Sequence, residues 1–160
     1  MGLHLVSDTP PHQKSKQEQQ QQQKEEEKKL SPFTKRILIV DDDPDITFTF
    51  KQAFEVNRIS GNKSSFHVST YNDPIVALSE FKPDFYDLLL VDINMPKMNG
   101  FDFCARVLKI DINPRVCFMS SEFINQEALR EQYPSLSIGC FVRKPVTIED
   151  LVKRVKAELN

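Results

Sequence analysis

The chain has 160 residues, a formal net charge of −2 and 28% charged residues. This length suits one domain, or one domain with a tail, and provides a core that needs neither disulfides nor metal for stability. No stretch approaches the ~20 apolar residues of a membrane span, and residues 1–10 fit neither a signal peptide nor a myristoylation signal. No basic stripe suggests nucleic-acid binding. We therefore expect a soluble, cytoplasmic protein that binds neither nucleic acid nor a membrane.

Three cysteines are present, at positions 104, 117 and 140. Their number is odd, their spacing is wide, and they form no CxxC pair and have no histidine nearby. This pattern argues against a disulfide framework or a zinc site. It predicts buried thiols in a reducing compartment.

Residues 13–29 read QKSKQEQQQQQKEEEKK and include no apolar residue. Such a segment cannot bury enough surface to offset its chain entropy, and it lacks the heptads of a coiled coil. The sequence predicts a disordered or transiently helical arm over residues 1–34. A solvated spacer is its simplest role, and contact with a partner is the alternative.

Beyond residue 34, short apolar runs alternate with amphipathic stretches. The apolar runs predict strands at 37–40, 66–71, 88–91, 116–119 and 139–142. Helices are expected to begin near Pro44, Pro74, Gly100, Ile124 and Ile148, with Asp43 as the cap of the first and a loop at Gly61–Asn62. Five strands alternating with five helices predict a doubly wound α/β fold, for which we favour the flavodoxin-like strand order 2-1-3-4-5.

The run Leu88–Asp92 is the most informative strand. Four apolar residues without alternation predict a strand buried on both faces, and the run stops at a carboxylate. Ligands of open parallel sheets bind beyond the carboxyl ends of the strands, so Asp92 is a candidate site residue. The alternative is that Asp92 only caps the following loop, Ile93–Gly100.

The favoured order brings the ends of four strands together, with Asp41, Asp42, Asp92, Ser120 and Lys144. Three crowded carboxylates repel one another, so they either retain protons or hold a cation. Hard oxygen ligands of this kind suit Mg²⁺. Together with an ammonium and a hydroxyl group, they provide what phosphoryl transfer to a carboxylate requires.

Four motifs occur in order: ILIVDDDPD (37–45), LLLVDINMPKMNG (88–100), FMSSE (118–122) and FVRKP (141–145). In these motifs, residues 35–160 resemble the receiver (CheY-like) domain of two-component response regulators, of the stand-alone type. By this resemblance Asp92 is the phosphorylated residue, Ser120 binds the phosphoryl group and Lys144 pairs with it. Asp42 and Asp92 are Mg²⁺ ligands, Asp41 acts through water and Asn94 supplies a backbone carbonyl.

The resemblance also implies a mechanism. Asp92 attacks the phosphohistidine of a sensor histidine kinase, Ser120 moves toward the new phosphate, and Phe141 turns into the freed space. Asn94 and Glu122 hold the positions that tune hydrolysis, and their polar side chains predict a short-lived phosphoryl state. The protein would be no enzyme beyond its own phosphorylation and dephosphorylation. Because no output domain follows Asn160, we expect output through contact with a downstream protein or phosphotransfer to a histidine phosphotransferase.

Two alternatives remain. A receiver-fold module could act as a scaffold without phosphorylation. The string Asp43–Thr47 also fits the DxDxT motif of haloacid-dehalogenase-type phosphatases, but the match is displaced by two residues from the strand end and leaves Asp92 and Lys144 unexplained. A calcium loop over Asp41–Gln52 fails, since its sixth and twelfth positions are Ile and Gln.

Overall fold

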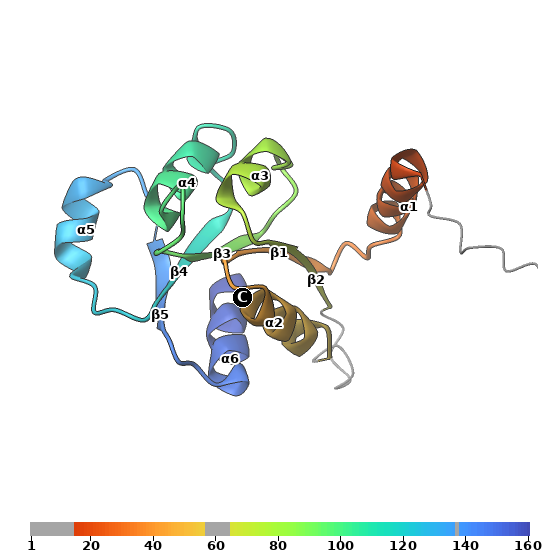
Figure 1. Cartoon of the computed structure of the whole chain (residues 1–160). Helices are drawn as coiled ribbons and strands as arrows, with labels where there is room; N and C mark the ends of the chain where they lie inside the picture. The colour runs from red at the N-terminus through yellow and green to blue at the C-terminus, as the bar shows by residue number, and fades with distance from the viewer. Residues whose placement is uncertain (1–14, 57–64, 137) are drawn as a thin grey trace, which may run out of the picture. The chain divides into compact units, whose positions relative to one another are not determined.

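The computed structural model describes residues 15–56, 65–136 and 138–160 (Figure 1). The chain divides into two compact units, Met1–Pro32 and Phe33–Asn160. This division falls within two residues of the predicted boundary between residues 34 and 35. The predicted loop at Gly61–Asn62 lies outside the described residues.

Helix α1 (Lys16–Lys28) belongs to the first unit. Its start is a capping box, in which Ser15 Oγ accepts from Glu18 N at 3.3 Å and Glu18 Oε2 accepts from Ser15 N at 2.9 Å. None of its residues is buried. Where the sequence predicts a disordered or transiently helical arm, the structure has a helix that rests on this cap and on the good helix propensities of Gln, Glu and Lys.

The second unit is built on a five-stranded parallel sheet in the order β2-β1-β3-β4-β5. Its strands are β1 (Lys35–Val40), β2 (Phe66–Tyr71), β3 (Leu88–Asp92), β4 (Arg115–Ser120) and β5 (Ile138–Arg143). The predicted flavodoxin-like order is confirmed. All five residues of β3 are buried, as expected for a central strand covered on both faces.

Two layers of helices cover the sheet (Figure 1). Helices α2 (Pro44–Val56) and α6 (Ile148–Leu159) pack on one face, while α3 (Pro74–Ser79) and α4 (Gly100–Leu108) pack on the other. Helix α5 (Gln126–Gln132) buries one residue, Leu129, which agrees with its thin apolar face. The five predicted helices are present, and α1 is an additional helix.

The prediction of three buried thiols is wrong for two of the cysteines. Cys117 in β4 and Cys140 in β5 are register partners with Cα atoms 4.6 Å apart, and the structure joins them in a disulfide. They are 23 residues apart in sequence, so only the register of the sheet reveals their proximity. Cys104 is the free, buried thiol, and burial raises its pKa.

Candidate functional site

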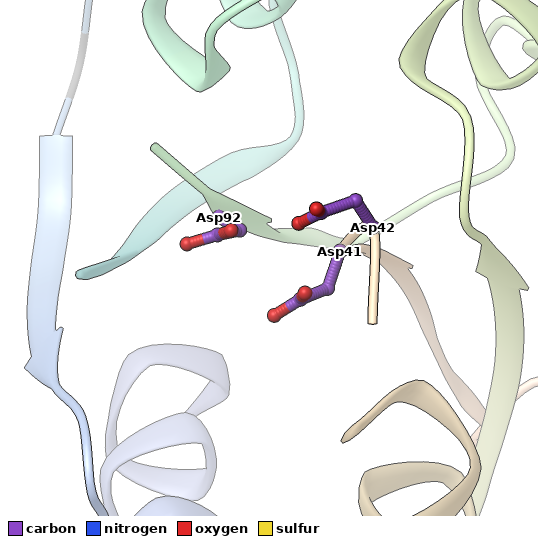
Figure 2. A group of neighbouring side chains, drawn as sticks. All are labelled: Asp41, Asp42 and Asp92. Carbon is purple, nitrogen blue, oxygen red and sulfur yellow. The ribbon is translucent and has the colours of Figure 1, made fainter. Parts of the chain in front are cut away.

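Three carboxylates gather at the carboxyl edge of the sheet. Asp41 and Asp42 follow β1 directly, and Asp92 ends the neighbouring strand β3, where Val40 is the register partner of Val91. Each carboxylate has an oxygen within 4.8 Å of the others. Figure 2 shows the three side chains extending into the same space. The sequence prediction that these acids meet is therefore confirmed.

Lys144 extends from the end of β5 to these acids. Its Nζ donates to Asp41 Oδ2 at 2.6 Å and lies 3.3 Å from Asp92 Oδ1. Burial alone would lower the pKa of Lys144, but the hydrogen bond to Asp41 and the charges of Asp41 and Asp92 raise it above its ordinary value. Lys144 is therefore a fixed positive charge between two of the three acids.

Asp41 and Asp42 have different surroundings. Asp41 is buried, and its Oδ1 accepts from Asp43 N at 3.0 Å while its Oδ2 accepts from Lys144. Asp42 is exposed, and none of the described residues donates a hydrogen bond to its carboxylate. Asp42 is thus open for direct contact with a cation, whereas both oxygens of Asp41 already have donors.

Asp92 is buried, and its pKa is raised to about 6. Loss of solvation is the largest cause, followed by the negative charge of Asp41, while Lys144 acts in the opposite direction. Asp92 is therefore mostly ionised at neutral pH, in a setting where added positive charge would favour the ionised form further. A capping role limited to the loop does not explain this arrangement, because Asp92 pairs with Lys144 after β5 and lies within 4.8 Å of the carboxylate of Asp41 after β1.

Ser120 ends β4 and is buried. Its carbonyl accepts from Lys144 N at 2.8 Å, which fixes the ends of β4 and β5 side by side, and its hydroxyl accepts from Glu122 N at 3.0 Å. A pocket of about 350 Å³ lies beside it, lined by Ser120, Glu122 and the half-buried Phe141, among others. Ser120 and Phe141 thus border the same open space.

Asn94 and Glu122 are both exposed. Among the described residues, no contact joins the side chain of either to the carboxylates, so their roles stay predictions. Asp43 caps α2 as predicted, since its Oδ1 accepts from Asp45 N at 2.9 Å. Thr47 donates its hydroxyl to Pro44 O at 3.2 Å. Asp43 and Thr47 therefore serve the start of α2, which leaves the phosphatase reading without support.

Gly100 lies next to the site, at the end of the motif that begins at Leu88. The motif contains this glycine, but only the structure shows why a glycine is needed there. Its N donates to Ile93 O at 2.9 Å and returns the β3–α4 loop to the sheet. A Cβ at this position would overlap the carbonyl oxygen of Asp92. Glycine is needed here for close backbone approach.

Sequence reasoning missed Asn72, which directly follows β2. Its Nδ2 donates to Asp41 O at 2.8 Å and to Thr47 Oγ1 at 2.9 Å. The signal that could have revealed it is a polar amide at the end of a strand adjacent to β1. The motifs assign no functional residue to that strand end.

The fold and this edge define a doubly wound α/β domain with a cluster of acids at the carboxyl edge of its sheet. The sequence matches the family described as the response regulator receiver domain over residues 37–156. It is 31% identical over 127 residues to the transcriptional regulatory protein PrrA of Mycobacterium leprae, covering 78% of this chain and 50% of PrrA. It is 27% identical over 125 residues to the response regulator receiver protein CpdR of Brucella abortus, covering 78% of this chain and 97% of CpdR.

Among solved structures, the non-phosphorylated HemR receiver domain from Leptospira biflexa superposes with a TM-score of 0.67 at 25% identity, covering 79% of this chain and 94% of that one. The chain belongs to the response regulator receiver domain family, as its four motifs predict. It spans about half the length of several curated relatives, PrrA among them. Within the described residues, no helix is long and apolar enough to cross a membrane.

Proposed function

We propose that this domain accepts a phosphoryl group on Asp92 from a sensor histidine kinase. Its output would be phosphorylation-dependent protein contact or onward phosphotransfer. The observation that carries the proposal is the pairing of a buried carboxylate with a fixed ammonium group, since Lys144 Nζ lies 3.3 Å from Asp92 Oδ1 beside two further acids.

In the proposed reaction, a carboxylate oxygen of Asp92 attacks the phosphorus of a phosphohistidine. The new P–O bond forms as the P–N bond breaks, and the electron pair of that bond leaves with the imidazole. The attacking group must be ionised, which the pKa of about 6 allows at neutral pH. Lys144 would then pair with the phosphoryl oxygens, whose negative charge it offsets.

The donor set fits Mg²⁺, because three carboxylates with oxygens within 4.8 Å supply the hard ligands this ion prefers. Asp42 and Asp92 would hold it directly, Asp41 through water, and Asn94 through its backbone carbonyl. The ion would supply positive charge next to the phosphoryl oxygens. The bonds that Asp41 already makes to Asp43 N and Lys144 support its indirect role.

The response to phosphorylation would involve Ser120 and Phe141. The Ser120 hydroxyl would leave Glu122 N for the phosphoryl group, and Phe141 would occupy the space beside it. The pocket bordered by both residues supports this movement. Polar side chains at Asn94 and Glu122 would position water and keep the acyl phosphate short-lived.

The direct test is incubation with Mg²⁺ and acetyl phosphate, followed by intact-mass measurement. We expect a gain of one phosphoryl group that is lost in Asp92→Asn and kept in Asp43→Asn, which changes a neighbouring acid that only caps α2. A fluoroberyllate mimic should shift the amide resonances around Asp92 in the same Mg²⁺-dependent way. If the wild-type protein gains no mass and shows no shift, the scaffold alternative stands in place of the receiver mechanism.

A kinase partner implies a cytoplasmic location, and we propose both together. We also propose that the only chemistry the protein catalyses is its own phosphorylation and dephosphorylation. The Cys117–Cys140 disulfide is the feature that counts against a reducing compartment. The number of free thiols in protein taken from cells decides between a reducing and an oxidising compartment.

A further inference from the structure

The junction of β2 and α3 contacts both segments that carry the proposed Mg²⁺ ligands. It consists of Asn72 and Asp73, which link the last residue of β2 to the first residue of α3. Asn72 contacts the segment that follows β1, and Asp73 contacts the loop that follows β3. These two contacts are independent, since they involve different side chains and different partners.

Asn72 fixes the backbone from which Asp41 and Asp42 project. Its Nδ2 has two hydrogens and donates to two acceptors, Asp41 O at 2.8 Å and Thr47 Oγ1 at 2.9 Å. The neighbouring carbonyl of Tyr71 accepts from Asp41 N at 3.2 Å. Both backbone polar groups of Asp41 are therefore bound by residues 71 and 72, and Thr47 attaches the same amide to α2.

Asp73 fixes the loop that carries Asn94. Its Oδ1 accepts from Ile75 N at 2.8 Å and caps α3, while its Oδ2 accepts from Lys97 Nζ at 2.6 Å. Lys97 has φ of 70°, a left-handed conformation that non-glycine residues adopt only when their surroundings hold them there. The ion pair is exposed, so it adds little to overall stability, and its effect lies in the position of the loop.

We propose that Asn72 and Asp73 are positioning residues that hold the Asp41–Asp42 segment and the β3–α4 loop at the separation that cation binding requires. Neither residue touches the reacting atoms. Asn72 acts through the carbonyl of Asp41, and Asp73 acts through Lys97. This inference rests on the proposed function, because it concerns the same Mg²⁺ site.

Single substitutions can remove each of these contacts with little change in side-chain size. Asn72→Asp keeps the size of the side chain, removes both donated hydrogens and adds a negative charge. That charge by itself would favour Mg²⁺, so weaker binding in this variant reports the lost hydrogen bonds. Asp73→Asn keeps the oxygen that caps α3 but removes the charge that faces Lys97. Lys97→Gln removes the other half of the ion pair. Glu80→Gln is the matched control, because Glu80 accepts from Tyr71 Oη at 2.9 Å near the far end of α3. Among the described residues, its side chain has no hydrogen bond or ion pair with either loop.

Because the chain has no tryptophan, Mg²⁺ affinity is best measured from amide chemical shifts of the full chain during titration. We expect Asn72→Asp to weaken Mg²⁺ binding about tenfold, the lower end of what residues behind metal ligands contribute. Asp73→Asn and Lys97→Gln should each weaken it about two- to fivefold, and the double variant no further than either single variant. Glu80→Gln should match the wild type.

A second measurement separates a weaker Mg²⁺ site from a general loss of folded, reactive protein. At saturating Mg²⁺ the rate of phosphorylation by acetyl phosphate should return close to the wild-type value, while the Mg²⁺ concentration for half the maximal rate stays raised. In Asp73→Asn the thermal midpoint of unfolding without Mg²⁺ should change little. This variant therefore tests the inference even if Asn72→Asp does not fold.

The inference is overturned if folded Asn72→Asp and Asp73→Asn both bind Mg²⁺ as the wild type does. If the wild type binds Mg²⁺ and is phosphorylated, that result removes the positioning role alone. If the wild type itself binds no Mg²⁺, the proposed function and the positioning role fail together.

Discussion

Lys144 Nζ lies closer to Asp41 than to Asp92, at 2.6 Å from Asp41 Oδ2 and 3.3 Å from Asp92 Oδ1. The contact with Asp41 spans 103 residues of sequence and joins the ends of β5 and β1 across β3 and β4. In this state the ammonium group is bound mainly by an acid that is not the proposed phosphoryl acceptor. It stays near enough to Asp92 to engage a phosphoryl group without a large movement.

Replacing Lys144 should destabilise the domain. Lys144→Met removes the cation that faces Asp41 and Asp92 and leaves two buried carboxylates facing each other. Removing one partner of a buried ion pair is costly, and because the Lys144 side chain is 17% exposed to water we expect a loss of about 1–3 kcal/mol in the free energy of unfolding. Urea unfolding without Mg²⁺ measures it.

Added Mg²⁺ should recover part of that loss, since it replaces the missing positive charge. Lys51→Met is the control, because Lys51 pairs with Glu55 on the exposed surface of α2 at 4.0 Å. Equal, small losses in the two variants would show that Lys144 contributes no more than a surface lysine does.

The raised pKa of Asp92 predicts how stability depends on pH without Mg²⁺. The unfolded chain loses this proton near pH 3.8 and the folded protein near pH 6, so between these values the folded state binds more protons. The free energy of unfolding should therefore fall as the pH rises through this window. Because the neighbouring Asp42 is exposed and Lys144 is half-buried, water screens part of this effect, and we expect about 1–2 kcal/mol rather than the full value of the shift.

Asp92→Asn should lack that fall, so the difference between variant and wild type should grow from pH 4 to pH 6.5 and then level off. Chemical unfolding at several pH values gives the comparison. A constant difference over this range would show that Asp92 keeps an ordinary pKa.

Gly100→Ala should displace the β3–α4 loop. The new Cβ would overlap the carbonyl oxygen of Asp92, which belongs to the backbone of the buried strand β3. Overpacking of this kind costs about 1–3 kcal/mol, and moving Asp92 should also slow phosphorylation by acetyl phosphate. Both effects are measured on the same protein, by urea unfolding and by intact mass against time.

Gly139→Ala is the matched control. Its Cβ would meet the carboxylate of Glu158 at 2.6 Å, the far end of a flexible side chain that can move aside. We expect a smaller loss of stability and an unchanged phosphorylation rate. If the two alanine variants behave alike, the close approach of Gly100 to Asp92 has no special effect.

The strands could be predicted from local patterns, and the fold class that they define has a favoured strand order, from which the meeting of the acids follows. Leu88–Val91 is apolar without alternation, and strand order then places the residue after each strand at one edge. The capping box at Ser15 is equally local, but the lack of apolar residues in this segment favours a disordered arm and conflicts with its helix propensity and its cap. Helix α1 forms although none of its residues is buried, so the capping box and the helix propensities of its residues are enough for a helix there.

What could not be predicted depends on exact register or on contacts between loops. Cys117 and Cys140 face each other only because β4 pairs with β5 in one register, which contains an irregularity next to Cys117. The two hydrogen bonds of Asn72 depend on where the β2–α3 junction lies relative to β1. Strand β4 is buried on both faces over Val116–Ser120, so it has no alternation of apolar and polar residues that would fix its register.

The disulfide gives a prediction about thiol counts. Denatured in alkylating reagent without reductant, the protein should expose one reactive thiol, Cys104, and with reductant it should expose all three. Reduction reopens a loop of 23 residues, which corresponds to a loss of about 3 kcal/mol in the free energy of unfolding. In the folded protein Cys104 should react slowly in either case, because burial raises the pKa of its thiol.

Cys140→Ser separates this covalent effect from packing. It should expose two thiols without reductant and should make stability insensitive to reductant, whereas Cys104→Ala should keep the sensitivity. Protein taken from cells under rapid acid quench gives the state that applies to function. Three thiols there would mean that β4 and β5, the strands that end at Ser120 and next to Lys144, are joined in the cell by their hydrogen bonds alone.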